Sequence, residues 1–165
     1  MNVVDLVHRP IDAAALLAGV GSPDAGANLL FTGTTRRTTG EVTTDWLDYE
    51  AYEPLARSEL ERLRDQAIVR FGLCGCGIVH RLGRVAVGET SVAVAVSAGH
   101  RREALAAADW LLNELKRQVP IWKREAGPGG MAWVHPESAG KPGTEAPAQG
   151  SRGTTQAIGA SADDG

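Results

Sequence analysis

Apolar positions along the chain follow two spacings, one extended and one helical. The extended spacing, in short runs of β-branched and aliphatic residues, predicts strands at 2–7, 27–32, 42–49, 75–81, 85–87, 90–97 and 131–134. In the clearest of these, at 90–97, the valines face one way and the alanines Ala93 and Ala95 face the other. The alanine side of that strand therefore admits a closely packed helix.

Helical spacing predicts three helices. Asp12 is placed to cap a short first helix that runs through Leu17. Pro54 suits the first turn of the second, whose apolar positions are Ala56, Leu60, Leu63, Ala67 and Phe71. The third runs from about Arg101 to Gln118, and its expected buried stripe is Leu105, Ala108, Leu112, Leu115 and Val119. This order of strands and helices indicates an α+β fold.

The third helix starts with side chains that helix stability does not require. His100, Arg101 and Arg102 occupy its first turn, where free backbone N–H groups and the helix dipole favour anions. A bound carboxylate or phosphate would use arginine forks, an imidazole and free N–H groups together. We therefore expect an anion at this helix start; the alternative is that the three side chains simply point to solvent.

The end of the third helix carries the densest cluster of cationic residues. Within residues 116–125 there are four Lys or Arg side chains, a proline and a tryptophan. Pro120 must end the helix, because proline disfavours the α conformation before it and lacks an N–H to donate. Lys116 therefore lies on the last turn, while Lys123 shares one face of an extended segment with Ile121. This corner can bring both ammonium groups to one pocket; alternatively, they complement the helix dipole on a solvated face.

A polar loop at residues 33–40 places Arg36 and Arg37 among hydroxyl side chains between two glycines. Loops of this kind are either hairpin tips or lids that bind anions. The length of this loop does not distinguish a hairpin tip from an anion-binding lid.

Composition limits the classes of function. A chain of 165 residues with 43% hydrophobic content can build one domain with its own core. The net charge of -3 argues against a general binder of nucleic acid or anionic membranes, so phosphate binding would need a local cluster of cations. Cys74 and Cys76 are too close for an unstrained disulfide and too few for a closed zinc site. Because the start also lacks a signal peptide and no segment is apolar enough to span a membrane, we expect a cytoplasmic protein.

The last thirty residues differ in composition from the rest. Residues 136–165 are mainly Gly, Ala, Ser, Thr and Pro, with Ile158 as the only large aliphatic side chain. Such a segment cannot bury enough apolar surface to order itself. We expect one domain at 1–135 and a disordered C-terminal tail at 136–165.

Several of these pieces, in order and at fixed spacing, resemble the catalytic (large) subunit of molybdopterin synthase, the MoaE family. The resemblance covers about residues 3–134 and ends in a Pro-Ile-Trp-Lys signature, which makes it more specific than any single motif. The matching residues are Phe31-Thr32-Gly33 with Arg36, Leu47 with Glu50 and Tyr52, His80-Arg81 with Gly83, Gly88-Glu89, Ser97 with His100-Arg101, Lys116 with Pro120-Ile121-Trp122-Lys123 and Glu125, and Trp133.

The resemblance implies a fold, a reaction and partners. The fold would be an α/β hammerhead with an additional antiparallel sheet. The substrate would be cyclic pyranopterin monophosphate, converted to molybdopterin by two sulfurs from the thiocarboxylated Gly-Gly C-terminus of a small ubiquitin-like subunit. The large subunit would form a homodimer within a heterotetramer, and the enzyme would use no metal and no bound organic cofactor.

The resemblance also implies site residues. Lys116 and Lys123 would be catalytic. Phe31, Arg36 and the adjacent pair His100 and Arg101 would bind substrate. A thiocarboxylate and a cyclic phosphate are both anions, so several cations must meet in one pocket. A lysine shielded from water beside other cations would have a lowered pKa, which suits proton transfer.

Other residues and functions remain as alternatives. His80 lies in a predicted strand, and Trp122 and Trp133 are large aromatics, so we expect packing roles for these three. A non-catalytic module that captures the tail of a ubiquitin-like partner would need only one carboxylate clamp, and so fewer cations. A nucleotide- or phosphate-binding protein is disfavoured, because neither common glycine-rich phosphate loop is present.

Overall fold

The computed structural model describes residues 2–134, which form two four-stranded sheets, a two-stranded hairpin and three helices. The strands are β1 (Asn2–Val7), β2 (Ala27–Thr34), β3 (Thr38–Thr39), β4 (Val42–Thr43), β5 (Trp46–Ala51), β6 (Leu73–Arg81), β7 (Gly83–Ala86), β8 (Thr90–Ala98), β9 (Ile121–Gly127) and β10 (Gly130–Val134). The helices are α1 (Ala13–Val20), α2 (Glu53–Phe71) and α3 (Arg101–Gln118). The α+β class is therefore confirmed, and the predicted tail at 136–165 lies outside the described residues.

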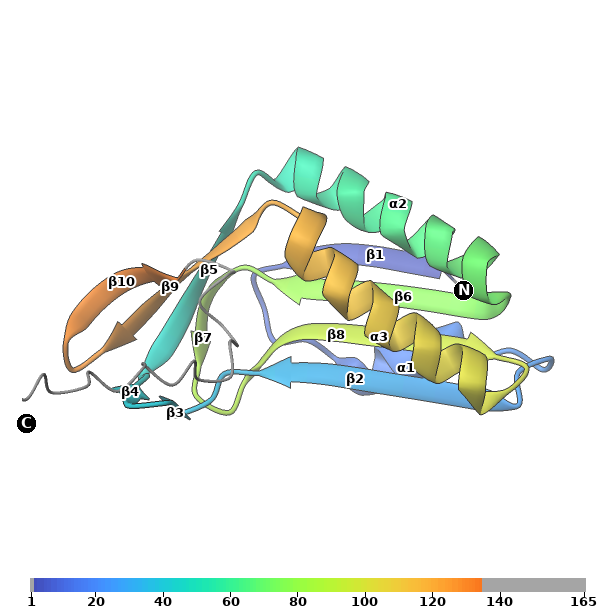
Figure 1. The fold of residues 1–165 in the computed structure, drawn as a ribbon, viewed down its shortest axis with the longest axis horizontal. Helices are drawn as coiled ribbons and strands as arrows, with labels where there is room; N and C mark the ends of the chain where they lie inside the picture. Colours follow the sequence, from blue (N-terminus) through green and yellow to red (C-terminus); the bar gives the residue numbers. More distant parts are fainter. Residues whose placement is uncertain (1, 135–165) are drawn as a thin grey trace, which may run out of the picture.

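The first sheet carries the main core. Its strand order is β1-β6-β8-β2, with β1 parallel to β6 and the other neighbours antiparallel. Helices α2 and α3 lie side by side over one face, and α1 lies on the other (Figure 1). The apolar positions predicted for α2 face this sheet, since Ala56, Leu60, Leu63 and Ala67 are fully buried. Pro54 stands in the first turn of α2 as expected, where its missing N–H costs nothing.

The alanine face of β8 is covered by α1, as the sequence predicts. Ala93 and Ala95 pack with Leu16 and Val20 of that helix. The Asp12 carboxylate caps α1 by accepting a hydrogen bond from the Ala15 N–H at 2.9 Å. Small residues on the sheet therefore allow a short, capped helix to lie close to it.

The second sheet lies at one end of the first (Figure 1). Its order is β10-β9-β5-β7, and all its neighbouring strands are antiparallel. The strand predicted at 42–49 is divided, because the chain leaves the hairpin at Thr43 and enters the sheet only at Trp46. Between them, Thr44 is buried and its hydroxyl donates to the Glu125 carboxylate, while the Asp45 N–H donates to the Ala126 carbonyl oxygen at 2.8 Å. These bonds turn the chain and break the strand.

The expected buried stripe of α3 is wrong in one respect. Leu105 is 55% exposed, and the helix instead turns its small residues to the sheet. Its buried positions are Ala104, Ala107, Ala108, Leu111 and Leu115. Alanine lets a helix approach a sheet closely, and three alanines share this contact face with Leu111 and Leu115.

Trp122 and Trp133 both belong to the second sheet and are about half exposed in the single chain, at 49% and 53%. They are therefore not core residues of this chain, and packing at an interface stays a prediction. Within residues 2–134, none of the helices has the length and apolar character needed to cross a membrane.

Candidate active site

The two predicted lysines lie on either side of the corner between α3 and β9. Lys116 is exposed on the last turn of α3, and Lys123 is half-buried on β9. The corner is tight, because the Val119 N–H donates to the Leu115 carbonyl at 3.1 Å and the Ile121 N–H donates to the Val119 carbonyl at 2.8 Å. The helix end, proline corner and strand predicted from the sequence are thus confirmed.

Three cations meet around the Lys123 ammonium group. Burial lowers the pKa of Lys123, the Glu125 carboxylate opposes that change, and the charges of Lys116 and Arg36 lower the pKa further. The charges of Arg36, on a loop, and Lys116, on a helix, therefore both act on Lys123, which lies on a strand. A shielded lysine with a lowered pKa can hold or release a proton nearer neutral pH than an exposed one.

Arg36 is exposed, but the backbone around it is fixed. We call residues 35–45, which connect β2 to β5, the Arg36 loop. On one side, the Thr35 N–H donates to the Glu89 carbonyl at 3.0 Å and the Gly88 N–H donates to the Thr35 carbonyl at 2.9 Å. On the other side, the Thr44 hydroxyl donates to the Glu125 carboxylate and the Asp45 N–H donates to the Ala126 carbonyl oxygen at 2.8 Å. The guanidinium group thus extends from a loop anchored at both ends.

The polar side chains Tyr49 and His80 lie close to Lys123, where the two sheets meet. Tyr49 is the cross-strand partner of Lys123, and its ring meets the His80 ring edge-on at 5.0 Å between centroids. Burial raises the pKa of the Tyr49 phenol, and so does the nearby Glu125 carboxylate. Tyr49 therefore remains protonated at neutral pH and can donate a hydrogen bond.

The other predicted cations lie elsewhere. His100 is the N-cap residue of α3 and Arg101 its first residue, whereas Lys116 stands on its last turn. Fifteen helical positions separate Arg101 from Lys116, which is about 22 Å at the rise of an α-helix. One copy of the chain thus holds two separate groups of cations, and the structure does not bring His100 and Arg101 to Lys123.

Phe31 lies on β2, opposite Val94 of β8, and is 38% exposed. It shares a strand face with Leu29, which packs against the core next to α3. Because β2 leads directly into the Arg36 loop, Phe31 stands five residues before Arg36 on the approach to the cation cluster.

The sequence did not single out Thr35, Thr44 or Tyr49, which lie around the cluster. Tyr49 looks like an ordinary strand residue, and only the pairing of β5 with β9 places it beside Lys123. Their role depends on contacts between strands far apart in the chain, for which a single sequence gives no signal.

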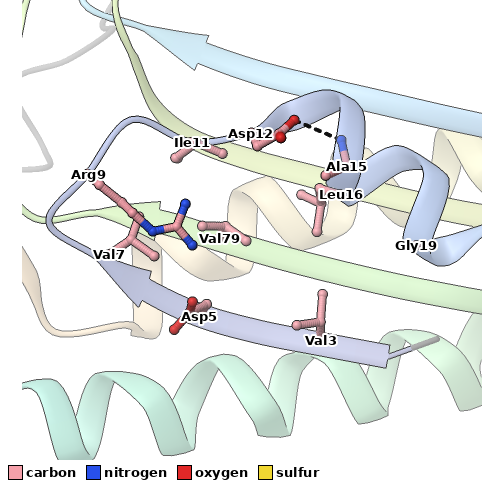
Figure 2. Close-up of a pocket in the computed structure, with 10 residues that line it drawn as sticks. All are labelled: Val3, Asp5, Val7, Arg9, Ile11, Asp12, Ala15, Leu16, Gly19 and Val79. Atoms are coloured by element: carbon pink, nitrogen blue, oxygen red, sulfur yellow. Dashed lines mark hydrogen bonds between the residues drawn. The ribbon is translucent and has the colours of Figure 1, made fainter.

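Within residues 2–134, no group of three or more His, Cys, Asp or Glu side chains is placed to hold a metal ion. A pocket of about 230 Å³ lies between β1 and α1, with Arg9 reaching over Val79 toward it (Figure 2). Its walls are mainly apolar, and none of the predicted site residues lines it. The cluster around Lys123 is therefore the candidate active site.

Comparison with known proteins gives consistent matches. Residues 6–118 match the family model described as MoaE protein. The molybdopterin synthase catalytic subunit of Ajellomyces capsulatus is 48% identical over 122 residues, which are 74% of this chain and 60% of that protein. The chain thus spans less than two thirds of this curated relative.

Two solved structures share the fold. The crystal structure of molybdopterin synthase from Staphylococcus aureus matches with a TM-score of 0.75 and 34% identity, over 78% of this chain and 94% of that one. The protein–protein complex of subunits 1 and 2 of molybdopterin-converting factor from Helicobacter pylori matches with a TM-score of 0.66 and 21% identity, over 79% of this chain and 89% of that one. Since the family model covers more than half of the chain, the chain belongs to the MoaE family, whose curated relatives are molybdopterin synthase catalytic subunits.

Proposed function

We propose that this chain inserts two sulfurs into cyclic pyranopterin monophosphate to make molybdopterin, in the cytoplasm, and that a small ubiquitin-like subunit delivers them as a C-terminal thiocarboxylate. The observation that carries the proposal is that Arg36 and Lys116 both lie near enough for their charges to act on the half-buried Lys123 ammonium group. Two anions must come together in this reaction, and a cluster of cations lowers the cost of holding both.

The surroundings of each residue indicate its role in the proposed reaction. Arg36 is exposed on an anchored loop, which suits capture of the substrate phosphate by a planar guanidinium fork. The lowered pKa of Lys123 suits proton transfer. Its charge also suits stabilisation of the oxyanion that forms when water attacks the carbonyl of the thioester between substrate and partner tail, which releases the tail as a carboxylate and leaves the sulfur on the substrate. Lys116 keeps the electrostatic potential next to Lys123 positive. Phe31 offers a partly exposed ring on the same approach.

We further propose that the active form is a homodimer within a heterotetramer. His100 and Arg101 lie about 22 Å along α3 from the lysines of their own chain. They can take part in substrate or tail binding only if a second copy brings its helix start to the cluster. A two-fold dimer would complete both sites at once.

The test is a reconstitution with purified chain, thiocarboxylated partner and cyclic pyranopterin monophosphate, with the dithiolene product followed by fluorescence after oxidation. Lys123→Ala and Lys116→Ala should each lower the rate at least about 100-fold, because a cation acting on the transition state is removed. The matched control is Arg117→Ala, which removes an exposed cation beside Lys116 that pairs with Glu114. Its rate should stay within about twofold.

Circular dichroism and partner binding should be unchanged in all three variants. Full activity of Lys123→Ala would contradict the proposal. A tight complex with the partner that gives no product, even with the unaltered chain, would instead favour a non-catalytic module that captures the tail.

A further inference from the structure

The pocket between β1 and α1 exists because α1 is too short to cover the whole face of the first sheet. Its eight residues pack on β8, β6 and β2, so β1, at the edge of the sheet, is largely uncovered on this side. The floor consists of Val3, Asp5 and Val7 of β1, with Val79 of β6 beside Asp5. Leu16 of α1 forms the opposite wall (Figure 2). We call this cavity the α1 pocket.

Three charged side chains line the α1 pocket, and among the lining residues only Arg9 lacks a partner. Asp5 accepts a hydrogen bond from the Arg57 guanidinium of α2 at 3.1 Å. Asp12 accepts one from the Ala15 N–H at 2.9 Å, which is the only side-chain hydrogen bond within the pocket (Figure 2). Both carboxylates thus already have a donor. The Arg9 guanidinium lies over the apolar floor and offers its N–H groups to an incoming acceptor.

The volume and the walls of the α1 pocket limit what it can hold. An apolar cavity of about 150 Å³ accepts one benzene ring. At about 230 Å³, the α1 pocket therefore has room for a body of about eight to ten non-hydrogen atoms. Most of its lining side chains are aliphatic, which favours an apolar body over a sugar or a nucleotide base.

We propose that the α1 pocket binds a small carboxylate with an apolar body of this size. The Arg9 guanidinium holds the carboxylate, and the body lies between Leu16 and Val79. This site is separate from the cation cluster, because successive side chains of a strand point to opposite faces of the sheet. Val79 packs toward α1, whereas the next residue, His80, meets the Tyr49 ring on the other side.

The test is an NMR titration of the purified chain with ¹³C-labelled methyl groups, followed at Val3, Leu16 and Val79. The probes are phenylpropionate, phenylpropanol and phenylpropylamine, which share one apolar body and differ in the polar group. Phenylpropionate should shift these signals with a Kd of about 1–5 mM, the range for a ligand of about ten non-hydrogen atoms. The alcohol should bind at least about threefold more weakly and the amine more weakly still, because neither accepts a charge-assisted hydrogen bond from Arg9.

Two variants with matched controls test the parts of the site. Arg9→Gln should weaken phenylpropionate binding at least about threefold and leave phenylpropanol binding unchanged. Arg117→Gln, which removes an exposed cation on α3, should change neither. Ala15→Leu should fill the α1 pocket and abolish binding of both probes, whereas Ala18→Leu, at an exposed position of the same helix outside the pocket, should not.

The proposal is overturned if phenylpropionate leaves the pocket signals unmoved, or if Arg9→Gln binds it as tightly as the unaltered chain. Shifts confined to residues around Lys123 would place the carboxylate on the cation cluster and also refute it. Tighter binding of the amine would assign the pocket mouth to Asp5 and Asp12 and refute the role of Arg9. If Ala15→Leu does not fold, the Arg9→Gln comparison decides alone. The titration uses neither substrate nor partner, so its result is independent of the proposed function.

Discussion

His80 shows how one buried residue couples folding to pH. The side chain is 5% exposed, and its Nδ1 donates a hydrogen bond to the Arg81 carbonyl oxygen at 2.9 Å. Burial lowers its pKa to about 4, and the backbone hydrogen bond only partly opposes this. The packing role expected for His80 therefore agrees with its contacts, which include the edge-on Tyr49 ring.

This pKa predicts an acid-sensitive stability. Between pH 6.5 and about 4 the unfolded chain takes up a proton on His80 that the folded chain does not, so the free energy of unfolding should fall as the pH falls. The loss is at most about 3 kcal/mol. Urea unfolding across this range should show a flatter pH dependence for His80→Gln than for the unaltered chain. His100→Gln, at an exposed position, should keep the original slope; equal slopes for all three would refute the prediction.

At the scale of elements, α1 and β6 approach so closely that only glycine fits between them. A Cβ atom on Gly75 would lie 2.4 Å from the Val20 carbonyl oxygen at the end of α1. Since the obstacle is backbone, a side chain cannot rotate away to make room. The nearby Gly19, within α1 itself, has open space where its Cβ would be.

Two glycine substitutions should therefore shift stability in opposite directions. Gly75→Ala should lower the free energy of unfolding by about 1–3 kcal/mol, because α1 must move off the sheet. Gly19→Ala should raise it by about 0.5–1 kcal/mol, because alanine loses less backbone entropy in a helix. Thermal unfolding followed by circular dichroism measures both. A Gly75→Ala variant as stable as the unaltered chain would mean that the two elements are not held this close.

Most elements could be predicted from the sequence, because proline, glycine and capping residues mark their ends. Asp12 and Pro54 identified helix starts, and the alternation of valine and alanine identified the face of β8 that α1 covers. The exposed Leu105 was not predicted, since a periodic pattern does not reveal whether a sheet prefers leucine or alanine at close approach. The break at Thr44 was missed for a similar reason: its partner, Glu125, lies 81 residues away.

At the scale of the whole molecule, the site was only partly predictable. The lysines follow from a local corner and Arg36 from the family resemblance, but their meeting depends on which strands pair. The sequence also marked His100 and Arg101 as an anion site, and helix length alone separates them from Lys123 in one chain. The family resemblance grouped the six residues as one pocket, whereas the predicted length of the third helix already separates two of them from the lysines within one chain.

If a second copy completes each site, two inactive variants should restore activity when mixed. Lys123→Ala removes one half of the site and Arg101→Ala the other, so each alone should be nearly inactive. After unfolding and refolding together, half of the dimers combine the two variants, and each of these has one intact site of two. The reconstituted rate should recover to about a quarter of the unaltered value. No recovery in refolded mixtures that contain mixed dimers would place His100 and Arg101 outside the lysine site.

The cation cluster lies at the seam between two separate sheets, and this has a consequence for heat inactivation. The first sheet is backed by α2 and α3, whereas the Arg36 loop joins the second sheet through a few hydrogen bonds of Thr44 and Asp45. Regions with few buried contacts open first on warming, while the main core remains folded. On heating, the chain should therefore lose the geometry of its site several degrees before its helices melt, so a preparation that still looks folded can already be inactive.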